Sequence, residues 1–290
     1  MAPSKSIASI AVILLLAAGL AAAGGTGSVD AGAITLFALC GLIAFVVNWL
    51  VYVPSQIAKT EHYFDLTGSL TYITVTAIAL IGNDGRDARA TIIAVLVWVW
   101  AARLGSFLFL RIRKDGKDGR FDRIKTNPLQ FLMTWTLQGL WVFLTLAAGL
   151  VALTTDSPQD IDALTIVGVV VWLAGFAIEV TADRQKSAFR ADPANEGRFI
   201  TVGLWAWARH PNYFGEITLW TGIALIALPV MDGWQHVTLI SPVFVFVLLT
   251  RISGIPMLTR RSLKRWGDDP EFMAYFESTP ALIPRPPKKG

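Results

Sequence analysis

The segment RHPNYFGE, from Arg209 to Glu216, gathers hydrogen-bonding side chains immediately before a long apolar stretch. Pro211 suits the first turn of a helix, and the free backbone N–H groups of such a turn attract anions such as phosphate. Asn212 and Tyr213 would then share a helix face with Glu216. An amide and a carboxylate one turn apart can satisfy the donors and the acceptor of a neutral carboxamide. The segment therefore predicts a binding site for a polar ligand.

Charged residues precede this segment at helical spacing. Glu179 and Asp183 are four residues apart, so they lie on one face of a helix. If that helix continues, Lys186 and Arg190 lie close to the same face. Acid and base groups stacked in this way can be ordinary i,i+4 ion pairs. They can also bind a phosphorylated ligand that enters from the cytoplasm, and both interpretations stay open.

The connection ADPANEGRFITVGLWAWARHPNYFGE favours the ligand-binding interpretation. It is neither a solvated run of charges nor an apolar span. A simple loop between two helices does not need two glycines, two tryptophans, an amide and a guanidinium at this density. The residues in question are Asn195, Gly197, Arg198, Gly203, Trp205 and Trp207.

The elements that position these residues are predicted to be membrane-spanning helices. Of the 290 residues, 54% are hydrophobic and only 16% are charged, a balance that a soluble domain rarely tolerates. Runs of about 18 or more apolar residues are typical of transmembrane helices. Eight such runs occur, at roughly 7–23, 32–54, 65–82, 90–112, 128–153, 162–182, 213–231 and 237–258. We therefore expect an all-helical polytopic membrane bundle with seven core helices and an additional N-terminal one if the first run is retained.

Lysine and arginine are concentrated in alternate loops. Seven lie between Arg111 and Lys125, five between Arg184 and Arg209, and eight from Arg251 to the end, whereas 24–31, 154–161 and 232–236 contain none. This is the positive-inside pattern of a membrane protein, so the basic loops are expected to face the cytoplasm. The pattern accounts for the net charge of +4 without a nucleic-acid partner.

The first 31 residues allow two interpretations. Lys5, an apolar run and the sequence AAAGGTGS are typical of a signal peptide with a small-residue cleavage site, or of a first transmembrane helix. We therefore divide the chain into an N-terminal hydrophobic segment, 1–31, and a membrane domain, 32–290. Cys40 is the only cysteine, which excludes an intrachain disulfide and a cysteine-based metal cluster. No metal site is expected.

Three stretches resemble the steroid 5α-reductase family and its bacterial membrane relatives: NEGRFITVGLWAWARHPNYFGE, SGIPML at 253–258 and YFESTPALIP near the C-terminus. The similarity covers roughly residues 32–284 and is most specific over 179–258. It implies a monomeric seven-helix reductase of the bacterial inner membrane. Such an enzyme uses NADPH to saturate the double bond of a 3-oxo-Δ4-steroid or a similar lipid-like enone. The same superfamily contains membrane methyltransferases with a similar Arg-His-Pro motif.

Carried over by position, the resemblance implies contacts with NADPH on the cytoplasmic side. The residues are Asp183, Arg190, Asn195, Arg198, Arg209, His210, Asn212, Tyr213, Glu216 and Arg251. It also implies that Glu61 in KTEHYFDLTGSLTY binds the substrate ketone, with Tyr63 as a second catalytic candidate and Asp65 as the rival acid. Thr60 stands where the vertebrate steroid enzymes have glutamine, and Trp100 stands where a tyrosine is expected. These departures concern the substrate more than the cofactor.

The residues around Glu61 support an interpretation of their own. Thr67, Thr71 and Thr74 recur on one helix face, which indicates either a hydroxyl-lined cavity or close packing between helices. If this helix begins near Gln56, Glu61 enters the edge of the membrane. An apolar environment would raise the pKa of Glu61, so that the neutral acid could donate a hydrogen bond to a ketone.

The resulting hypothesis is hydride transfer from NADPH to the β-carbon of an enone, with an acid that stabilises the developing enolate. No GxGxxG sequence follows a strand, so a Rossmann domain is excluded and the cofactor must bind within the helical bundle. The alternative is an S-adenosylmethionine-dependent methyltransferase that acts on a lipid or prenyl-cysteine. It does not require Arg190, Arg198 and Arg251, which suit a cofactor with three phosphates. A transporter would show broken helices in matching halves, and no such symmetry is visible.

Overall fold

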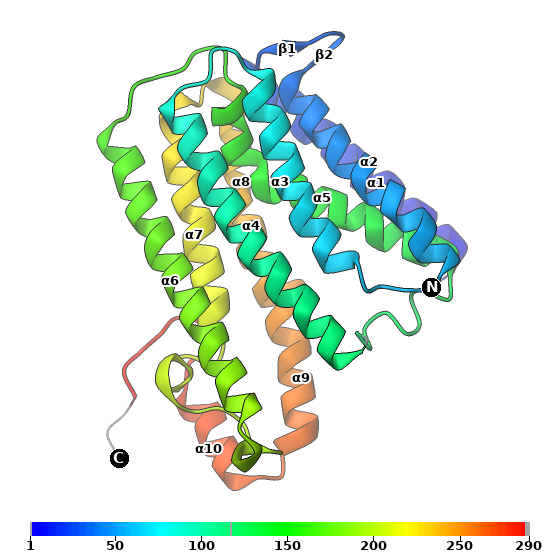
Figure 1. Ribbon diagram of the computed structural model, residues 1–290, viewed down its shortest axis with the longest axis vertical. Coiled ribbons are helices and arrows are strands. Elements are labelled where there is room, and N and C mark those ends of the chain that lie inside the picture. Colours follow the sequence, from blue (N-terminus) through cyan, green and yellow to red (C-terminus); the bar gives the residue numbers. More distant parts are fainter. Residues whose placement is uncertain (1, 117, 288–290) are drawn as a thin grey trace. The chain divides into compact units, whose positions relative to one another are not determined.

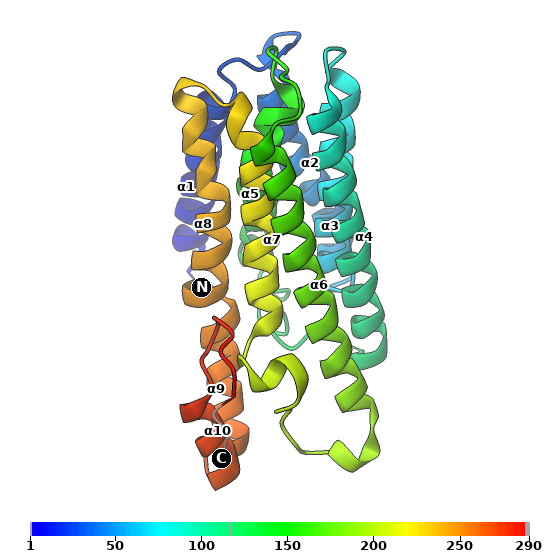
Figure 2. The same cartoon turned by 90° about the vertical axis from the view of Figure 1, so that its left-hand side faces the viewer.

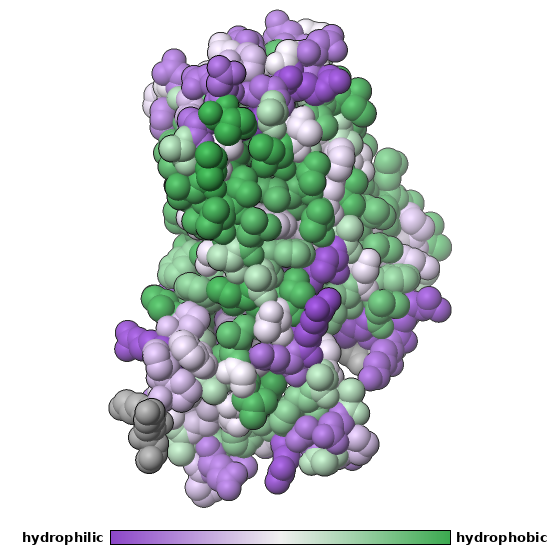
Figure 3. All heavy atoms as spheres, turned by 60° about the vertical axis from the view of Figure 1, so that its left-hand side comes forward, coloured by the Kyte–Doolittle hydropathy of each residue, from purple (hydrophilic) through white to green (hydrophobic). Residues whose placement is uncertain are grey.

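The computed structural model describes residues 2–116 and 118–287 and confirms the expected helical membrane fold (Figure 1). Among these residues, eight helices are long and apolar enough to cross a membrane. The first six are Pro3–Gly24 (α1), Leu36–Ile57 (α2), Phe64–Gly82 (α3), Ala88–Asp115 (α4), Pro128–Thr154 (α5) and Ala163–Ala191 (α6). Figure 3 shows hydrophobic side chains gathered over the middle of the helices and hydrophilic ones toward their ends, as a bilayer requires.

The last two spans contain more than one type of helix. The seventh, Pro211–Val230, consists of α7 (Pro211–Ala227) and a 3₁₀ turn, η3 (Leu228–Val230). The eighth, Gly233–Trp266, consists of η4 (Gly233–Leu239), α8 (Ile240–Val247), the π-helical turn η5 (Leu248–Ile252) and α9 (Gly254–Trp266). Outside the spans lie α10 (Pro270–Ser278), the 3₁₀ turns η1 (Pro193–Asn195) and η2 (Gly203–Ala206), and a short hairpin of β1 (Asp30–Ala31) and β2 (Ile34–Thr35).

Several helices begin at the polar residue that the sequence provides. The side chains of Thr35, Asp87 and Asn127 precede α2, α4 and α5. Each accepts a hydrogen bond from the backbone N–H three residues later, at 3.3, 2.7 and 3.1 Å respectively. These bonds satisfy N–H groups that have no partner within the helix. The starts of the spans are therefore set by local sequence.

Two helix boundaries differ from the expected ones. Helix α6 continues to Ala191, nine residues past the expected end at 182, because no glycine or proline interrupts the polar sequence that follows the apolar run. Helix α3 begins at Phe64 and not near Gln56. The chain turns at Lys59, whose φ is +48°, so Glu61 lies in the connection between α2 and α3.

The described residues form two compact units. The first contains the residues up to Thr165 together with Ala224–Ser241, and therefore α1 to α5. Helix α5 is its centre, where Trp135, Phe143 and Leu146 are buried, and it packs against α1, α2, α3 and α4. Helices α3 and α4 lie side by side in both ribbon views (Figures 1 and 2).

The second unit contains Ile166–Ile223 and the residues from Pro242 onward. Helices α6 and α7 lie side by side within it (Figure 2). Glycines allow their backbones to touch: a Cβ atom on Gly215 would lie 2.6 Å from the carbonyl oxygen of Gly175. A Cβ atom on Gly222 would lie 2.7 Å from that of Gly168. Small residues at such a seam are a common means of packing membrane helices, and this seam fixes α7 against α6.

We expect Gly215→Ala to lower the melting temperature of the detergent-solubilised protein. Alanine is favoured over glycine in a helix by about 1 kcal/mol. At Gly215 the added methyl group would instead meet backbone, which must move, and overpacking costs roughly 1–3 kcal/mol. Gly19→Ala is the matched control, because a Cβ atom there meets nothing within 4 Å. Equal melting temperatures for the two variants would contradict the proposed backbone contact.

Candidate functional site

The end of α6 is the foundation of the candidate site. Residues 192–210, here called the connecting loop, join α6 to α7 and are attached to the last turns of α6. The indole N–H of Trp205 donates to the carbonyl oxygen of Ala182 at 3.0 Å. The backbone N–H of Leu204 donates to the side chain of Gln185 at 2.9 Å. Gly203 has φ of +61° and lies so close to Gln185 that a Cβ atom would clash, so only glycine suits this turn.

The Arg-His-Pro segment lies where the connecting loop enters α7. Helix α7 begins at Pro211, which confirms the prediction from the sequence. The side-chain amide of Asn212 donates to Asp183 at 3.3 Å, so α7 and α6 are also joined by a polar contact. The ring of His210 is buried and stacks on Tyr213, with ring centroids 5.6 Å apart. The motif is thus part of the packed end of the two helices.

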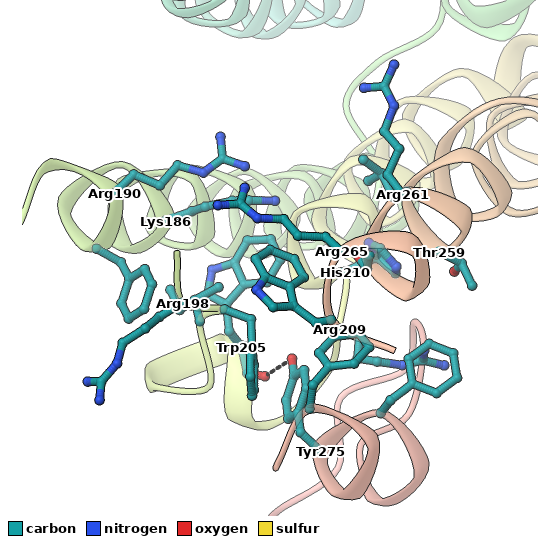
Figure 4. A pocket seen from close by; sticks show the side chains of 18 residues that line it. Lys186, Arg190, Arg198, Trp205, Arg209, His210, Thr259, Arg261, Arg265 and Tyr275 are labelled. Atoms are coloured by element: carbon teal, nitrogen blue, oxygen red, sulfur yellow. Dashed lines mark hydrogen bonds between the residues drawn. The ribbon is translucent and has the colours of Figure 1, made fainter. Parts of the chain in front are cut away.

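A pocket of about 290 Å³ lies among α6, the connecting loop, α9 and α10 (Figure 4). We call it the basic pocket, because six of its lining residues are cationic: Lys186, Arg190, Arg198, Arg209, Arg261 and Arg265. Seven are aromatic: Phe189, Phe199, Trp205, Trp266, Phe272, Tyr275 and Phe276. The remaining ones are Ile200, His210, Leu258, Thr259 and Ser262. Among the described residues that line it there is no aspartate or glutamate.

Aromatic faces hold several of these cations in place. The ammonium of Lys186 lies 4.3 Å from the ring centroid of Trp205. The guanidinium carbon of Arg265 lies 4.7 Å from the ring of Trp266. Each such contact is worth roughly 0.5–1 kcal/mol at an exposed site. The aromatic rings therefore orient the positive groups without neutralising their charge.

The rings of the pocket wall also pack on one another. Phe199 of the connecting loop meets Phe272 and Tyr275 of α10, at centroid distances of 5.1 and 5.9 Å. It also meets Trp266 of α9 at 6.0 Å. Aromatic pairs of this kind stabilise by about 0.5–1.5 kcal/mol beyond the area that they bury. The wall is therefore a preformed aromatic surface to which three segments contribute.

Burial sets the protonation of the polar groups around the pocket. It raises the pKa of Tyr275 to about 12, so the phenol stays protonated and donates to the carbonyl oxygen of Trp205 at 2.7 Å (Figure 4). Burial, together with the positive charges of Lys186 and Arg209, lowers the pKa of His210 to about 3. The imidazole is therefore neutral at physiological pH, and one of its nitrogens can donate while the other accepts.

The structure brings together four of the ten predicted cofactor residues. Arg190, Arg198, Arg209 and His210 line the basic pocket. The other six, which do not line it, are Asp183, Asn195, Asn212, Tyr213, Glu216 and Arg251. Asn195 donates to the carbonyl oxygen of Phe189 at 3.1 Å and so closes the turn after α6. Arg251 is exposed on the π-helical turn η5, and such turns are frequent at functional sites.

Residues of α9 and α10 were missed by the sequence interpretation. Arg261 and Arg265 are one helical turn apart on α9 and line the basic pocket, as do Phe272 and Tyr275 of α10. The available signal was the i,i+4 spacing of the two arginines just after the last apolar run. It indicated one positive helix face but not which segment that face would meet.

The surroundings of Glu61 correct one prediction. Its carboxylate is 1% exposed and accepts hydrogen bonds from the Lys125 ammonium at 2.6 Å and from the backbone N–H of Asp118 at 3.0 Å. Burial alone raises the pKa of Glu61, but these two hydrogen bonds bring it below its ordinary value. The expectation of a neutral acid in an apolar site was therefore wrong, because the basic loop between α4 and α5 folds over the carboxylate.

The other candidates near Glu61 have different environments. Asp65 lies 3.8 Å from Arg111 of α4, so each of the two acids of this stretch faces a cation. Tyr63 is half exposed, and its ring stacks on Phe109 at 6.5 Å. Trp100, one helix later, is buried edge-on against Tyr72.

The threonines of α3 favour the packing interpretation over a hydroxyl-lined cavity. The hydroxyl groups of Thr67 and Thr71 donate to carbonyl oxygens four residues earlier in the same chain, both at 2.7 Å. Both residues are buried, and Thr71 also accepts from the amide of Asn48 at 3.4 Å. These hydroxyl groups are thus engaged within the protein.

The fold and the site define a class: a polytopic helical membrane protein with a cation-rich, aromatic-walled pocket at the end of two of its spans. The chain belongs to the family described as proteins of unknown function, DUF1295, whose model matches residues 51–279. It is 23% identical to the uncharacterised protein C594.04c of Schizosaccharomyces pombe, over 73% of this chain and 71% of that protein. No solved structure matches the chain. The family match includes both the surroundings of Glu61 and every described lining residue of the basic pocket.

We expect His210 to make the protein less stable in acid. Its pKa is about 6.5 in an unfolded chain and about 3 in the folded one, so the unfolded state binds the proton more readily between these values. Stability from this residue is therefore complete above about pH 6.5 and is lost as the pH falls toward 3. Between pH 7 and pH 5 the loss is about 2 kcal/mol.

His210→Asn should reduce the difference in melting temperature between pH 7 and pH 5. The exposed His236 provides the control, and His236→Asn should leave that difference unchanged. An acid response that is as steep in His210→Asn as in the parent protein would show that folding does not lower the pKa of His210.

Proposed function

We propose that the protein is an NADPH-dependent reductase that saturates the carbon–carbon double bond of a 3-oxo-Δ4-steroid or a similar lipid-like enone. The observation that carries the proposal is the basic pocket, which presents six cationic residues and no carboxylate among its described lining. NADPH carries a pyrophosphate and a separate phosphate, together with an aromatic base. A lining of guanidinium groups and aromatic faces suits all three features.

The basic pocket would hold the phosphate-bearing part of the cofactor. Arg190 and Arg198 line it from α6 and the connecting loop, and Arg265 lines it from α9. Guanidinium groups bind phosphate oxygens through two parallel hydrogen bonds, which gives both affinity and orientation. The nicotinamide end would bind near Asn212 and Glu216 at the start of α7, where an amide and a carboxylate suit a carboxamide. When bound, the nicotinamide supplies the hydride.

The identity of the substrate rests on the resemblance to steroid 5α-reductases. Two stretches that carry it, 195–216 and 275–284, are 59 residues apart in the sequence, and both contribute to the basic pocket. A lipid-like substrate also agrees with a protein whose described residues include eight candidate membrane spans, because such a substrate can enter from the bilayer. The positive-inside pattern supports a location of the basic pocket on the cytoplasmic side, where NADPH is available.

Lys125 and Glu61 would polarise the substrate as a pair. Glu61 is held as a carboxylate, so it cannot donate a hydrogen bond to a ketone. Its partner Lys125 is 20% exposed at the side chain, and an ammonium has three N–H donors, of which Glu61 uses one. We therefore assign the donor role to Lys125 and the positioning role to Glu61. A donor at the carbonyl oxygen stabilises the negative charge that develops there as hydride reaches the β-carbon.

The alternative is a methyltransferase, and the experiments must distinguish it from the reductase. S-adenosylmethionine carries a sulfonium cation and no phosphate. A pocket lined by six cationic residues repels the net positive charge of this cofactor, whose one carboxylate offers fewer partners to the guanidinium groups than the phosphates of NADPH do. The choice of cofactor therefore distinguishes the two reactions directly.

We expect NADPH to raise the melting temperature of the purified protein and S-adenosylmethionine to leave it unchanged. A ligand at a hundredfold excess over its dissociation constant stabilises by about 2.7 kcal/mol. Arg265→Gln removes a lining cation and should weaken NADPH binding about tenfold or more, since a charge-assisted hydrogen bond is worth about 1.5–3 kcal/mol. Lys264→Gln is the matched control, because this neighbouring cation does not line the basic pocket. Stabilisation by S-adenosylmethionine alone would reject the reductase.

Glu61 and Lys125 should behave as one unit in the reduction of a 3-oxo-Δ4-steroid. Loss of an oxyanion donor typically costs on the order of 100–1000-fold in rate, so Lys125→Met and Glu61→Gln should each cause such a loss. The double variant should be little worse than either single one, because the two residues support the same interaction. NADPH affinity should be unchanged throughout. Oxidation of NADPH in the presence of the enone provides the measurement.

Lys114→Met is the matched control, since Lys114 is an exposed cation at the end of α4. A rate that falls in Glu61→Gln but not in Lys125→Met would assign the donor role to Glu61 itself. Full activity in both variants, with a loss in Asp65→Asn, would transfer the role to Asp65.

A further inference from the structure

Arg209 contacts the C-terminal part of the chain at three points. Its backbone N–H donates to the carbonyl oxygen of Pro280 at 2.9 Å. Its side-chain Nε–H donates to the carbonyl oxygen of Thr279 at 3.1 Å. Its guanidinium carbon lies 3.8 Å from the ring centroid of Phe276. These partners are about 70 residues away in the sequence, so the contacts join two remote segments.

Further hydrogen bonds follow the same seam. The segment 270–285, here called the C-terminal strap, contains α10 and the residues after it. The hydroxyl of Tyr275 donates to the carbonyl oxygen of Trp205 at 2.7 Å, and the backbone N–H of Arg285 donates to that of Trp207 at 3.0 Å. The strap is therefore bound along the connecting loop, and Arg209 contacts it between the positions of Tyr275 and Arg285.

The basic pocket is incomplete without the C-terminal strap. The strap contributes Phe272, Tyr275 and Phe276 to the lining, and Figure 4 shows Tyr275 and its hydrogen bond to the connecting loop on this side. Phe272 is also buried against Phe199. Release of the strap would remove one wall and expose these rings to water.

The geometry points to Arg209 as a positioning residue that locks the C-terminal strap in place as the wall of the basic pocket. The planar guanidinium suits this role, because its face lies on Phe276 while an edge N–H reaches a backbone carbonyl. Lysine has neither the plane nor the fixed edge donor, so it cannot replace arginine here. The assignment differs from that of a phosphate ligand, for which positive charge alone would preserve much of the effect. Only the identity of the nucleotide rests on the proposed function.

Hydrogen exchange of the C-terminal strap in the nucleotide-free protein tests the lock directly. We expect Arg209→Gln and Arg209→Lys to speed exchange in 270–285 by about tenfold or more, because a partly buried hydrogen bond and a stacking contact are both lost. Phe276→Leu removes the stack without changing charge and should have the same direction of effect. Arg198→Gln is the control, since this exposed cation lines the basic pocket without a contact to the strap among the described interactions. Unchanged exchange in the Arg209 variants, or in Phe276→Leu if those variants fail to fold, would overturn the proposal.

NADPH affinity supplies a second readout. A lock predicts that Phe276→Leu weakens NADPH binding as Arg209→Gln does, and that the double variant is little worse than either. A phosphate ligand predicts that Arg209→Lys retains most affinity for NADPH, which would reject the lock. If the parent protein binds no NADPH, the proposed function fails, whereas the exchange experiment still decides the role of Arg209.

Discussion

Trp205 is the residue on which the arrangement of the basic pocket depends. Its indole N–H donates to α6, its carbonyl oxygen accepts from Tyr275 of α10, and its ring face carries the ammonium of Lys186. The side chain is almost wholly buried, so the hydrogen bond of its indole N–H is shielded from competing water. One residue of the connecting loop thereby fixes the distance between a helix end, a C-terminal helix and a cation. Displacement of this ring would alter all three at once.

The two units hold their cationic side chains in different ways. In the first unit, Glu61 and Asp118 face cations of the basic loop, and Asp65 faces Arg111 at the end of α4. The contact between Glu61 and Lys125 is 2.6 Å. Charge is largely neutralised there, and the ion pairs fix the loop. In the second unit, three of the cations that line the basic pocket, Lys186, Arg209 and Arg265, lie against aromatic faces, which orient them.

The helices could be predicted from the sequence because their determinants are local. Apolar length gave the spans, Pro211 gave the start of α7, and the positive φ of Gly203 and Gly197 explains why the connecting loop contains glycines. The partner of Glu61 could not be predicted in this way, since Lys125 is 64 residues away and sequence alone does not show which loop folds back. The contribution of α10 to the basic pocket was missed for the same reason, because Tyr275 meets Trp205 only through tertiary packing.

Two arginines of the basic pocket have different requirements, one for positive charge and the other for side-chain geometry. Arg198 is exposed, and the role that we propose for it in the basic pocket needs positive charge within reach of a bound anion. Arg209 is fastened between a carbonyl oxygen and an aromatic ring, and its role needs the shape of a guanidinium. The same residue type therefore serves two purposes within one pocket. A pocket for a multiply charged ligand needs both positive charge and a fixed wall. In the absence of an anion the clustered cations repel one another, so the wall must be held in place by other contacts.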